Sequence, residues 1–466
     1  MLDLQDIKKL YFIGIGGIGM SAIARYFLQR GVEVHGYDRT STELTRALEA
    51  EGMHVHYEED LSKVPAGVDL VVYTPAVPTS HAEYQHFLQN GTPIKKRAEV
   101  LGIISRGMKT VAIAGTHGKT TTSSLTAHLL RSTGVDCTAF LGGIARNFES
   151  NYVLGSSDWV VVEADEFDRS FLHLYPDIAS IMSMDADHLD IYGDEETLLN
   201  TGFKAFAKQI KPGGTLWLQH RLQHHFDGGD TVYRSFGVEG GDYQAHNIRV
   251  EKGYFVFDYT SPQGTIEGLQ MPLPGRHNVE NATVALSIAL QLGAKEADIR
   301  SGLAAFRGVK RRFEIIYRDE ETVFFDDYAH HPTELNAAIG AARELFPNSK
   351  ITGAFQPHLF SRTRDFADGF ADALDQLDEI YLLDIYPARE LPIPGVSSEM
   401  LVKLMKNPNV HQISKADLLP ALQNNKPEVL LTLGAGDIDT LVEPIGNWLN
   451  STKKTKQPRT KQPRTK

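Results

Sequence analysis

Apolar runs alternate with amphipathic segments along most of the 466-residue chain. The first run, KKLYFIGIGGIGM, ends in glycines and is followed by the helical pattern SAIARYFLQRG and a second short run, VEVHGYD. Apolar runs separated by helical segments are typical of strand–helix–strand units with a parallel sheet. The start of the chain is therefore predicted to form such a unit.

Two further blocks repeat this pattern, from KTVAIAGTHGKTT to DWVVVEADE and from TVFFDDYAHHPTELNAAIGAARELF to EVLLTLGAG, with GYFVFDYTSPQGTIEGLQMPLPG as a β-rich insertion in the second. The fold class predicted is α/β with three domains. They are an N-terminal Rossmann-like domain, a central parallel sheet of the P-loop ATPase type, and a C-terminal Rossmann-like domain. We place these domains at 1–105, 106–310 and 311–450.

The end of the chain differs in composition from the rest. KTKQPRTKQPRTK repeats KQPRT and has no apolar residue, so we expect a disordered basic tail over 451–466, with a partner-binding arm as the alternative. The net charge of the whole chain is −12, which gives no reason to expect affinity for nucleic acid or anionic membranes.

Cys137 is the single cysteine, which excludes an internal disulfide and a multi-cysteine metal site. We interpret it as a small buried residue rather than a nucleophile. The N-terminus shows no basic-then-apolar leader, and no apolar run reaches the roughly 18 residues that span a membrane. We expect a cytoplasmic protein without membrane insertion, and the oligomeric state stays open.

The first glycine loop has a dinucleotide-binding pattern. Gly14, Gly16 and Gly19 form G-x-G-x-x-G between a predicted strand and helix, and Asp38 ends the next predicted strand. Such glycines let the backbone approach a diphosphate at a helix N-terminus, and the acid can bind a ribose hydroxyl. By these rules alone the pattern predicts an NAD site, although a UDP group satisfies the same chemistry.

The second glycine loop, VAIAGTHGKTTTSS, is a shortened P-loop, because two residues rather than four separate Gly115 from Gly118. Lys119 can reach the β and γ phosphates of a nucleotide, and Thr120 can offer its hydroxyl to Mg²⁺. Glu163, in WVVVEADE, stands where a second magnesium ligand is expected. The alternative is that Glu163, Asp165 and Glu166 are surface acids at a strand end.

Two other polar segments follow. MDADHLDIYG brings Asp185, Asp187, His188 and Asp190 together, which suits a cation or phosphate, whereas a lone His188 would more often be structural. In LPGRHNVENATVALSIAL, Asn278 and Asn281 lie three apart on one helical face, where amides can read a base edge. Helix capping is the alternative for Asn278.

The third block places a polar cluster after each of two predicted strands and another at its seam with the second block. Forked arginine donors suit a carboxylate or a transferring phosphate, and a surface location is the alternative for any single one. The clusters contain Lys310, Arg311 and Arg312; Asp326, Asp327, Tyr328, His330 and His331; and His358, Arg362 and Arg364.

These motifs in this order resemble the Mur ligases, ATP-dependent amide-forming enzymes of peptidoglycan precursor synthesis. The resemblance runs from Lys9 to about Leu449 and is carried by GIGGIGM, GTHGKTTT, EADEFDRSFL, DADHLDIYG, GRHNVENATVA, DDYAHHPTE and QPHLFSRTRD. It is closest to the branch that joins L-alanine to UDP-N-acetylmuramate. It implies ATP and Mg²⁺ as cofactors and a role in cell-wall biogenesis, cell shape and cell division.

The resemblance also implies a role for each motif. The diphosphate and uridine of the sugar nucleotide, rather than NAD, would bind at Gly14, Gly16, Gly17, Ile18, Gly19 and Asp38. ATP would bind at Gly115, Thr116, His117, Gly118, Lys119, Thr120, Thr121, His277, Asn278, Asn281 and Arg312. Magnesium would bind at Thr120, Glu163 and His188. The catalytic residues implied are Lys119, His188, Asp327, His330, Arg362 and Arg364.

The chemistry implied has two steps. The lactyl carboxylate of UDP-N-acetylmuramate attacks the γ-phosphate to give an acyl phosphate and ADP, and the amine of L-alanine then displaces phosphate. Asp327 or His330 is the candidate base for the alanine ammonium. One departure is Ser183, where relatives commonly carry an asparagine.

Three alternatives are open at this stage. A recycling ligase of the same family would join a murein tripeptide to the same sugar nucleotide. An NAD-dependent dehydrogenase would explain the first glycine loop but leaves GTHGKTT without a role. A non-enzymatic nucleotide switch would use the second loop only.

Overall fold

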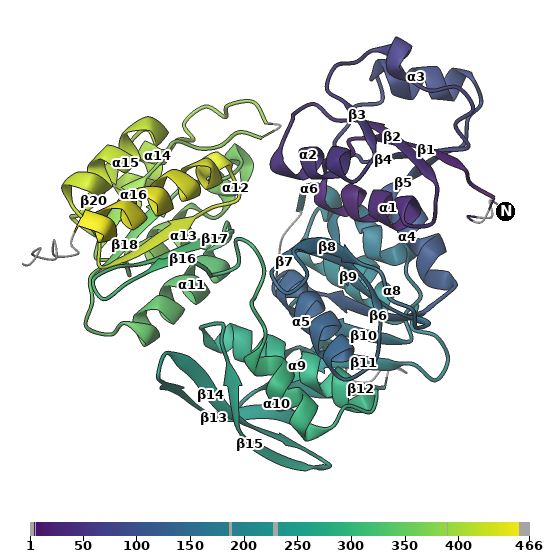
Figure 1. Cartoon of the computed structure of the whole chain (residues 1–466). Coiled ribbons are helices and arrows are strands. Elements are labelled where there is room, and N and C mark those ends of the chain that lie inside the picture. The colour runs from purple at the N-terminus through teal and green to yellow at the C-terminus, as the bar shows by residue number, and fades with distance from the viewer. Residues whose placement is uncertain (1–3, 5, 186–188, 227–231, 389, 456–466) are drawn as a thin grey trace, which may run out of the picture. The chain divides into compact units, whose positions relative to one another are not determined.

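The computed structural model describes residues 4, 6–185, 189–226, 232–388 and 390–455. The chain divides into two compact units (Figure 1). Unit 1 comprises Met1–Arg249, Phe255–Pro272 and His277–Lys310, and unit 2 comprises Val250–Tyr254, Leu273–Arg276 and Arg311–Lys466.

Unit 1 begins with a parallel five-stranded sheet in the order β3-β2-β1-β4-β5. Side chains alternate across β1, so Leu10 and Phe12 join the core on the α1 side while Tyr11 and Ile13 join the core on the α3 side. Its elements are β1 (Lys9–Ile13), α1 (Ile18–Leu28), β2 (Glu33–Tyr37), α2 (Glu43–Ala50), β3 (His54–His56), η1 (Leu61–Lys63), β4 (Leu70–Tyr73), α3 (Ala82–Gln89), β5 (Ile94–Lys96) and α4 (Arg97–Arg106).

The rest of unit 1 is built on a ten-stranded sheet in the order β15-β14-β13-β12-β11-β10-β6-β9-β7-β8. Its elements up to the insertion are β6 (Lys109–Ala114), α5 (Lys119–Ser132), β7 (Thr138–Ala145), β8 (Ser150–Val153), β9 (Trp159–Ala164), η2 (Phe167–His173), β10 (Ile178–Ile181), α6 (Leu189–Tyr192), α7 (Glu195–Thr197), η3 (Leu198–Phe203), α8 (Lys204–Ala207), β11 (Thr215–Gln219), η4 (His220–His225) and β12 (Tyr233–Val238). The strands from β12 to β7 run parallel, and β8 is antiparallel.

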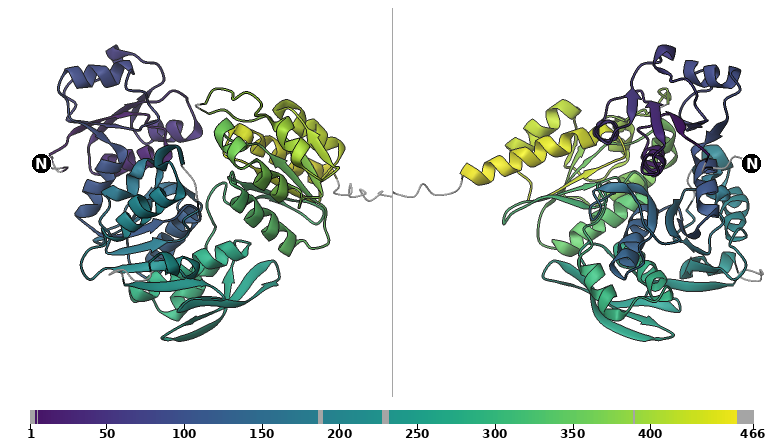
Figure 2. Two further views of the ribbon diagram at one scale, coloured as in Figure 1. Left: turned by 180° about the vertical axis from the view of Figure 1, so that it is seen from behind. Right: turned by 45° about the vertical axis from the view of Figure 1, so that its right-hand side comes forward.

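The predicted β-rich insertion is present and extends the central sheet instead of forming a separate layer. It consists of β13 (Tyr243–Glu251), β14 (Tyr254–Ser261) and β15 (Gly264–Met271), and β14 and β15 pair antiparallel. The helices α9 (Arg276–Gln291) and α10 (Glu296–Ala304) follow, and α10 packs on β15 (Figures 1 and 2).

Unit 2 contains a six-stranded sheet in the order β16-β17-β21-β18-β19-β20, which is parallel except for β16. Its elements are β16 (Glu314–Arg318), β17 (Val323–Asp327), α11 (Pro332–Leu345), β18 (Ile351–Phe355), α12 (Phe360–Asp365), α13 (Ala367–Leu374), β19 (Glu379–Leu382), α14 (Ser398–Leu404), β20 (Val410–Gln412), α15 (Lys415–Asn424), β21 (Val429–Leu433), η5 (Asp437–Leu441) and α16 (Val442–Thr455).

The predicted fold class is confirmed, with one refinement: the central sheet is mixed rather than wholly parallel. The helix α16 runs to Thr455, beyond the point at which the basic tail was expected to begin. Within the part of the chain that the structure describes, no helix combines the length and apolar character needed to cross a membrane.

Candidate functional site

The first glycine loop turns sharply from β1 into α1. Gly14 has φ +88°, and Gly17 is the N-cap of α1. The amide of Gly16 donates a 2.7 Å hydrogen bond to Asp38 Oδ2, and a β-carbon at Gly16 would lie only 2.6 Å from Thr45 Cγ2. Asp38 therefore holds the backbone of the loop, and whether it also contacts a uridine stays a prediction.

Arg97 is a neighbour of this loop that the sequence argument missed. A β-carbon at Gly19 would lie 2.8 Å from Arg97 Nη1, and the same guanidinium reaches Asp165 at 3.9 Å and the Ser170 hydroxyl at 3.4 Å. Arg97 thus connects the first glycine loop to the segment that follows β9. The residue that follows β5, Arg97, ends the basic run Lys95, Lys96 and Arg97 at the carboxyl end of that strand, where ligands of parallel sheets bind.

The shortened P-loop lies tightly against the end of β10. Gly115 has φ +135°, and a β-carbon there would lie 2.8 Å from the Ser183 amide nitrogen. Ser183 also accepts the amide of His117 on its hydroxyl at 2.7 Å and the amide of Thr116 on its carbonyl at 3.2 Å. Ser183, the residue that departs from the family pattern, therefore supports the backbone of the loop.

Lys119, the first residue of α5, is turned back over the loop. Its Nζ donates to the carbonyls of Gly115 at 2.6 Å and Thr116 at 3.2 Å, and to both oxygens of Glu166 at 2.8 and 3.0 Å. Burial opposes the lysine charge, but neighbouring acids, with Glu166 foremost, outweigh it and raise the pKa of Lys119. The ammonium is held charged beside the loop.

Glu166 is 1% exposed, so the interpretation of this residue as a surface acid is wrong. Its backbone carbonyl accepts the Tyr192 hydroxyl at 2.8 Å, which anchors the segment after β9. The sequence motifs predict Glu163 as a magnesium ligand and assign no role to Glu166. A cluster of acids at a strand end does not reveal which of them points at the lysine.

Thr120 and Glu163 lie against two adjacent glycines of β7. Glu163 Oε2 accepts the amide of Gly142 at 3.1 Å, and a β-carbon at Gly143 would lie 3.1 Å from Thr120 Cγ2. The register of β6 and β9 pairs Ile113 with Glu163, which puts this carboxylate one residue before the strand end. A hydroxyl and a carboxylate are ligand types that Mg²⁺ prefers, so the donors present fit that ion.

The predicted ligand His188 lies outside the described residues, as does Asp187. Asp185 is described: its Oδ2 lies 3.0 Å from His117 Nε2, and its carbonyl accepts the Thr116 hydroxyl at 3.1 Å. His117, which belongs to the loop motif, is therefore tied to the acidic segment. Thr121 is buried in the first turn of α5.

The amides of α9 meet the P-loop directly. Asn278 and Asn281 are both buried, and Asn281 Nδ2 donates to Asn278 Oδ1 at 3.3 Å. A β-carbon at Gly118 would lie 2.7 Å from Asn281 Oδ1, and Gly118 has φ +83°. The predicted pair is brought to the nucleotide loop, and His277 lies half-buried one residue before it.

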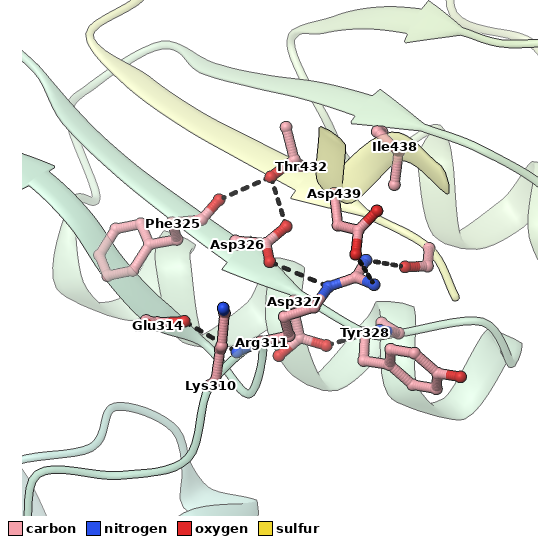
Figure 3. Close-up of polar contacts among 12 residues, drawn as sticks. Lys310, Arg311, Glu314, Phe325, Asp326, Asp327, Tyr328, Thr432, Ile438 and Asp439 are labelled. Carbon is pink, nitrogen blue, oxygen red and sulfur yellow. Dashed lines mark hydrogen bonds and ion pairs between the residues drawn. The ribbon is translucent and has the colours of Figure 1, made fainter. Parts of the chain in front are cut away.

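In unit 2, Arg311 pairs with a buried acid of the sheet (Figure 3). Arg311 Nε lies 3.2 Å from the buried Asp326 Oδ2, Nη2 donates to the Gly434 carbonyl at 2.6 Å, and Nη1 lies 3.3 Å from Asp439 Oδ2. Burial raises the pKa of Asp326, and Arg311 opposes this shift. This pair joins β17 to the segment after β21.

Arg312 takes a different position. Its guanidinium carbon lies 5.1 Å from the ring centroid of Tyr328, the same distance as that of Arg311, but its charge acts on Asp327. The two arginines therefore share the contact with Tyr328 but act on different acids, Asp326 for Arg311 and Asp327 for Arg312.

Asp327 ends β17 and accepts the amides of Phe313 at 2.6 Å and Ala329 at 2.7 Å. Burial raises its pKa to about 7, against the opposing charge of Arg312. His330 follows, with Nδ1 2.9 Å from the Tyr328 carbonyl and 3.2 Å from Glu334 Oε2. The two candidate bases are thus close in sequence and held by backbone contacts.

The two predicted arginines of α12 differ in exposure. Arg362 is half-buried, whereas Arg364 is exposed and pairs with its neighbour Asp365 at 2.7 Å. The start of α12 is held by Glu390, which accepts the amide of Ser361 at 2.9 Å and also bonds its hydroxyl. His358 stacks on Tyr386 with ring centroids 5.8 Å apart.

The fold and these loops define a Mur ligase. Residues 9–109 match the model of the Mur ligase family catalytic domain, 113–289 the Mur ligase middle domain, and 311–436 the Mur ligase glutamate ligase domain. The chain therefore belongs to the Mur ligase family, an ATP-dependent ligase family, which overturns the dehydrogenase and nucleotide-switch alternatives.

Within this family the chain is similar to particular members. A UDP-N-acetylmuramate–L-alanine ligase from Porphyromonas gingivalis is 50% identical over 96% of this chain and 100% of the relative. The crystal structure of the UDP-N-acetylmuramate-alanine ligase from Thermotoga maritima aligns with a TM-score of 0.81 at 30% identity, over 95% of this chain and 99% of that one. A murein peptide ligase from Psychrobacter arcticus aligns at 0.70 and 22% identity, over 95% and 98%, which shows a shared fold.

Proposed function

We propose that the protein joins L-alanine to the lactyl carboxylate of UDP-N-acetylmuramate, with ATP converted to ADP and phosphate. The observation that carries this assignment is the 50% identity to an alanine-adding ligase across nearly the full length of both chains. The P-loop is consistent with it, because Gly115 and Gly118 have positive φ and lead into the N-terminus of α5, where backbone amides can bind phosphate.

The roles proposed for unit 1 follow from its contacts. Lys119, already charged and held over the loop, binds the γ-phosphate, and Asn278 and Asn281 border the nucleotide beside Gly118. Thr120 and Glu163 hold Mg²⁺, which supplies charge neutralisation to the transferring phosphoryl group. The first glycine loop, from Gly14 to Gly19, binds the diphosphate of the sugar nucleotide.

The reaction then proceeds in two balanced steps. A lactyl carboxylate oxygen attacks the γ-phosphorus and ADP leaves, giving an acyl phosphate. The amine of L-alanine attacks the acyl carbon, inorganic phosphate leaves, and the ammonium proton passes to Asp327 or His330. Arg312 binds ATP, and Arg362 and Arg364 serve the anionic groups on the amino-acid side.

The remaining expectations are proposals of the same kind. We divide the chain into a sugar-nucleotide domain over 1–105, a nucleotide domain over 106–310 and an amino-acid-side domain over 311–450. A cytoplasmic location stays a prediction, as does the basic tail, of which 456–466 lie outside the described residues.

A phosphate-release assay tests the function. With ATP, Mg²⁺ and UDP-N-acetylmuramate present, each of L-alanine, glycine, L-serine and the murein tripeptide is added alone, and the product is identified by mass spectrometry. We expect phosphate release to depend on L-alanine, with the product heavier by one alanyl residue. Release that only the tripeptide supports would place the protein in the recycling branch.

A further inference from the structure

A cluster of metal-ligating side chains lies on the N-terminal sheet, apart from the loops described above. Glu33, His35 and His54 each offer one ligand atom, and these atoms all lie within 4.8 Å of one another. His35 Nε2 is 2.6 Å from Glu33 Oε1, and the rings of His35 and His54 stack with centroids 4.5 Å apart.

The backbone places these side chains together. His35 of β2 and His54 of β3 are register partners on adjacent parallel strands, so their side chains leave the same face of the sheet side by side. Glu33 precedes His35 by two residues and therefore projects from that face too. The cluster is a product of sheet register rather than of two flexible surface loops.

The carboxylate is also oriented. Lys9 Nζ lies 3.3 Å from Glu33 Oε2 and donates to the Ala66 carbonyl at 3.2 Å, while Glu33 Oε1 faces His35. One carboxylate oxygen is thus occupied by an anchored lysine and the other is directed at the imidazole. In metal sites, groups that bond to a ligand side chain in this way hold the ligand in its orientation.

We propose that Glu33, His35 and His54 bind a divalent transition cation of the zinc type. Two imidazoles and one carboxylate suit Zn²⁺, whereas Mg²⁺ prefers oxygen ligands alone, so the ion differs from the one proposed at Thr120 and Glu163. Three protein ligands leave a fourth position for water.

The cation links the three-residue edge strand β3 to β2. Glu33 and His54 are the first residues of their strands, whereas Gly14 and Asp38 follow the carboxyl ends of β1 and β2. The metal site and the first glycine loop therefore occupy opposite ends of the sheet, and zinc binding does not exclude a sugar nucleotide.

Calorimetric titration of the full, untagged chain with ZnCl₂ in excess Mg²⁺ tests the site. We expect one Zn²⁺ per chain with micromolar affinity, and a rise in the midpoint of thermal unfolding on binding. His54→Gln and Glu33→Gln are each expected to weaken binding by about tenfold or more, because each removes a direct ligand, while ligation of L-alanine is unchanged.

His411→Gln is the matched control. His411 also lies on an edge strand, β20, stacks on an aromatic ring, Tyr381, and faces one carboxylate, Glu379, at 3.5 Å. This variant should bind Zn²⁺ as the parent does. Equal affinity in the parent and His54→Gln, or the absence of binding tighter than millimolar in the parent, would overturn the proposal.

Discussion

The two glycine loops of unit 1 start alike and are supported differently. Each follows a buried parallel strand, opens with a glycine of positive φ, Gly14 or Gly115, and leads into a helix. In the first loop an acid, Asp38, accepts a loop amide. In the second the supports are the Ser183 hydroxyl and carbonyl, and the charged group is Lys119, held by Glu166.

This difference in support is consistent with different proposed ligands for the two loops. Both loops have amides already bonded within the protein, to Asp38 in the first and to Ser183 in the second, but the P-loop also keeps the cation of Lys119 beside its backbone. A buried lysine charge is stable only when paired, and Glu166 supplies that pairing. This arrangement supports the proposals that the second loop binds the transferring phosphate and that the first binds a diphosphate that is left unchanged.

The largest effect is expected for Lys119→Ala. Removing the cation proposed to bind the γ-phosphate should lower the rate of L-alanine-dependent phosphate release on the order of 10³-fold. Calorimetry should show UDP-N-acetylmuramate binding nearly unchanged, because that substrate is assigned to the other loop. Lys109→Ala, at the exposed start of β6, the strand that leads into the P-loop, is the control and should be fully active. Equal loss of both properties in Lys119→Ala would mean that the two loops do not work separately.

Glu166→Gln tests the pairing itself. The neutral amide no longer favours the lysine charge, so we expect the pKa of Lys119 to fall and kcat to drop by about tenfold. The alkaline limb of the pH–rate profile should also move to lower pH, a change that a purely structural role of Glu166 would not cause. An unshifted limb would show that the lysine charge does not depend on this acid.

Replacing the first glycine of each loop by alanine compares how much the two turns contribute to the free energy of unfolding. Gly115→Ala adds left-handed strain and a clash with backbone, and should cost about 3 kcal/mol of unfolding free energy. Gly14→Ala meets the Thr74 side chain at 2.9 Å, which can shift, and should cost about 2 kcal/mol.

Gly31→Ala is the control for these two variants. Gly31 has φ +80° with nothing within 4 Å of a β-carbon. Gly31→Ala therefore measures only the cost of the left-handed backbone conformation, about 1 kcal/mol of unfolding free energy. Urea unfolding measures all three. Equal costs at the three positions would mean that the close approach of Ser183 to Gly115 has no energetic consequence.

The smallest effect is expected on the pH dependence of stability at Asp327, which, like Asp38, accepts backbone amides. Its pKa is raised to about 7 in the folded chain, so the folded state holds this proton more tightly than the unfolded state does. Folding is therefore favoured most below the unfolded pKa of about 4, and the contribution declines as pH rises toward 7.

Asp327→Asn should remove this decline, which urea unfolding across that pH range would detect. If Asp327 is the base for the alanine ammonium, the acid limb of kcat near pH 7 also disappears in Asp327→Asn. An unchanged limb would favour His330, and His330→Gln would then remove it.

Much of the site was predictable from local sequence. Strand–glycine–helix patterns located both loops, and the spacing of Asn278 and Asn281 placed them on one face of α9, where the structure finds them bonded to each other. These predictions depend on residues within one or two turns of each other, for which chain geometry leaves few alternatives.

The partners across the fold were not predictable in this way. Nothing local distinguishes Glu166 from Glu163, or Arg311 from Arg312, although one of each pair is built into a buried network. Ser183 looked like a departure from the family pattern, and its contact with the P-loop depends on the pairing of β10 with β6.

The sequence by itself determined the α/β class, the order of the three blocks, both glycine loops and the family, because periodicity and short motifs are properties of neighbouring residues. Only the tertiary structure decided which acid holds Lys119, which arginine joins β17 to the segment after β21, and that Glu33, His35 and His54 meet. Those choices depend on strand order and register, which bring together residues far apart in the chain and bury some charges while leaving others in water.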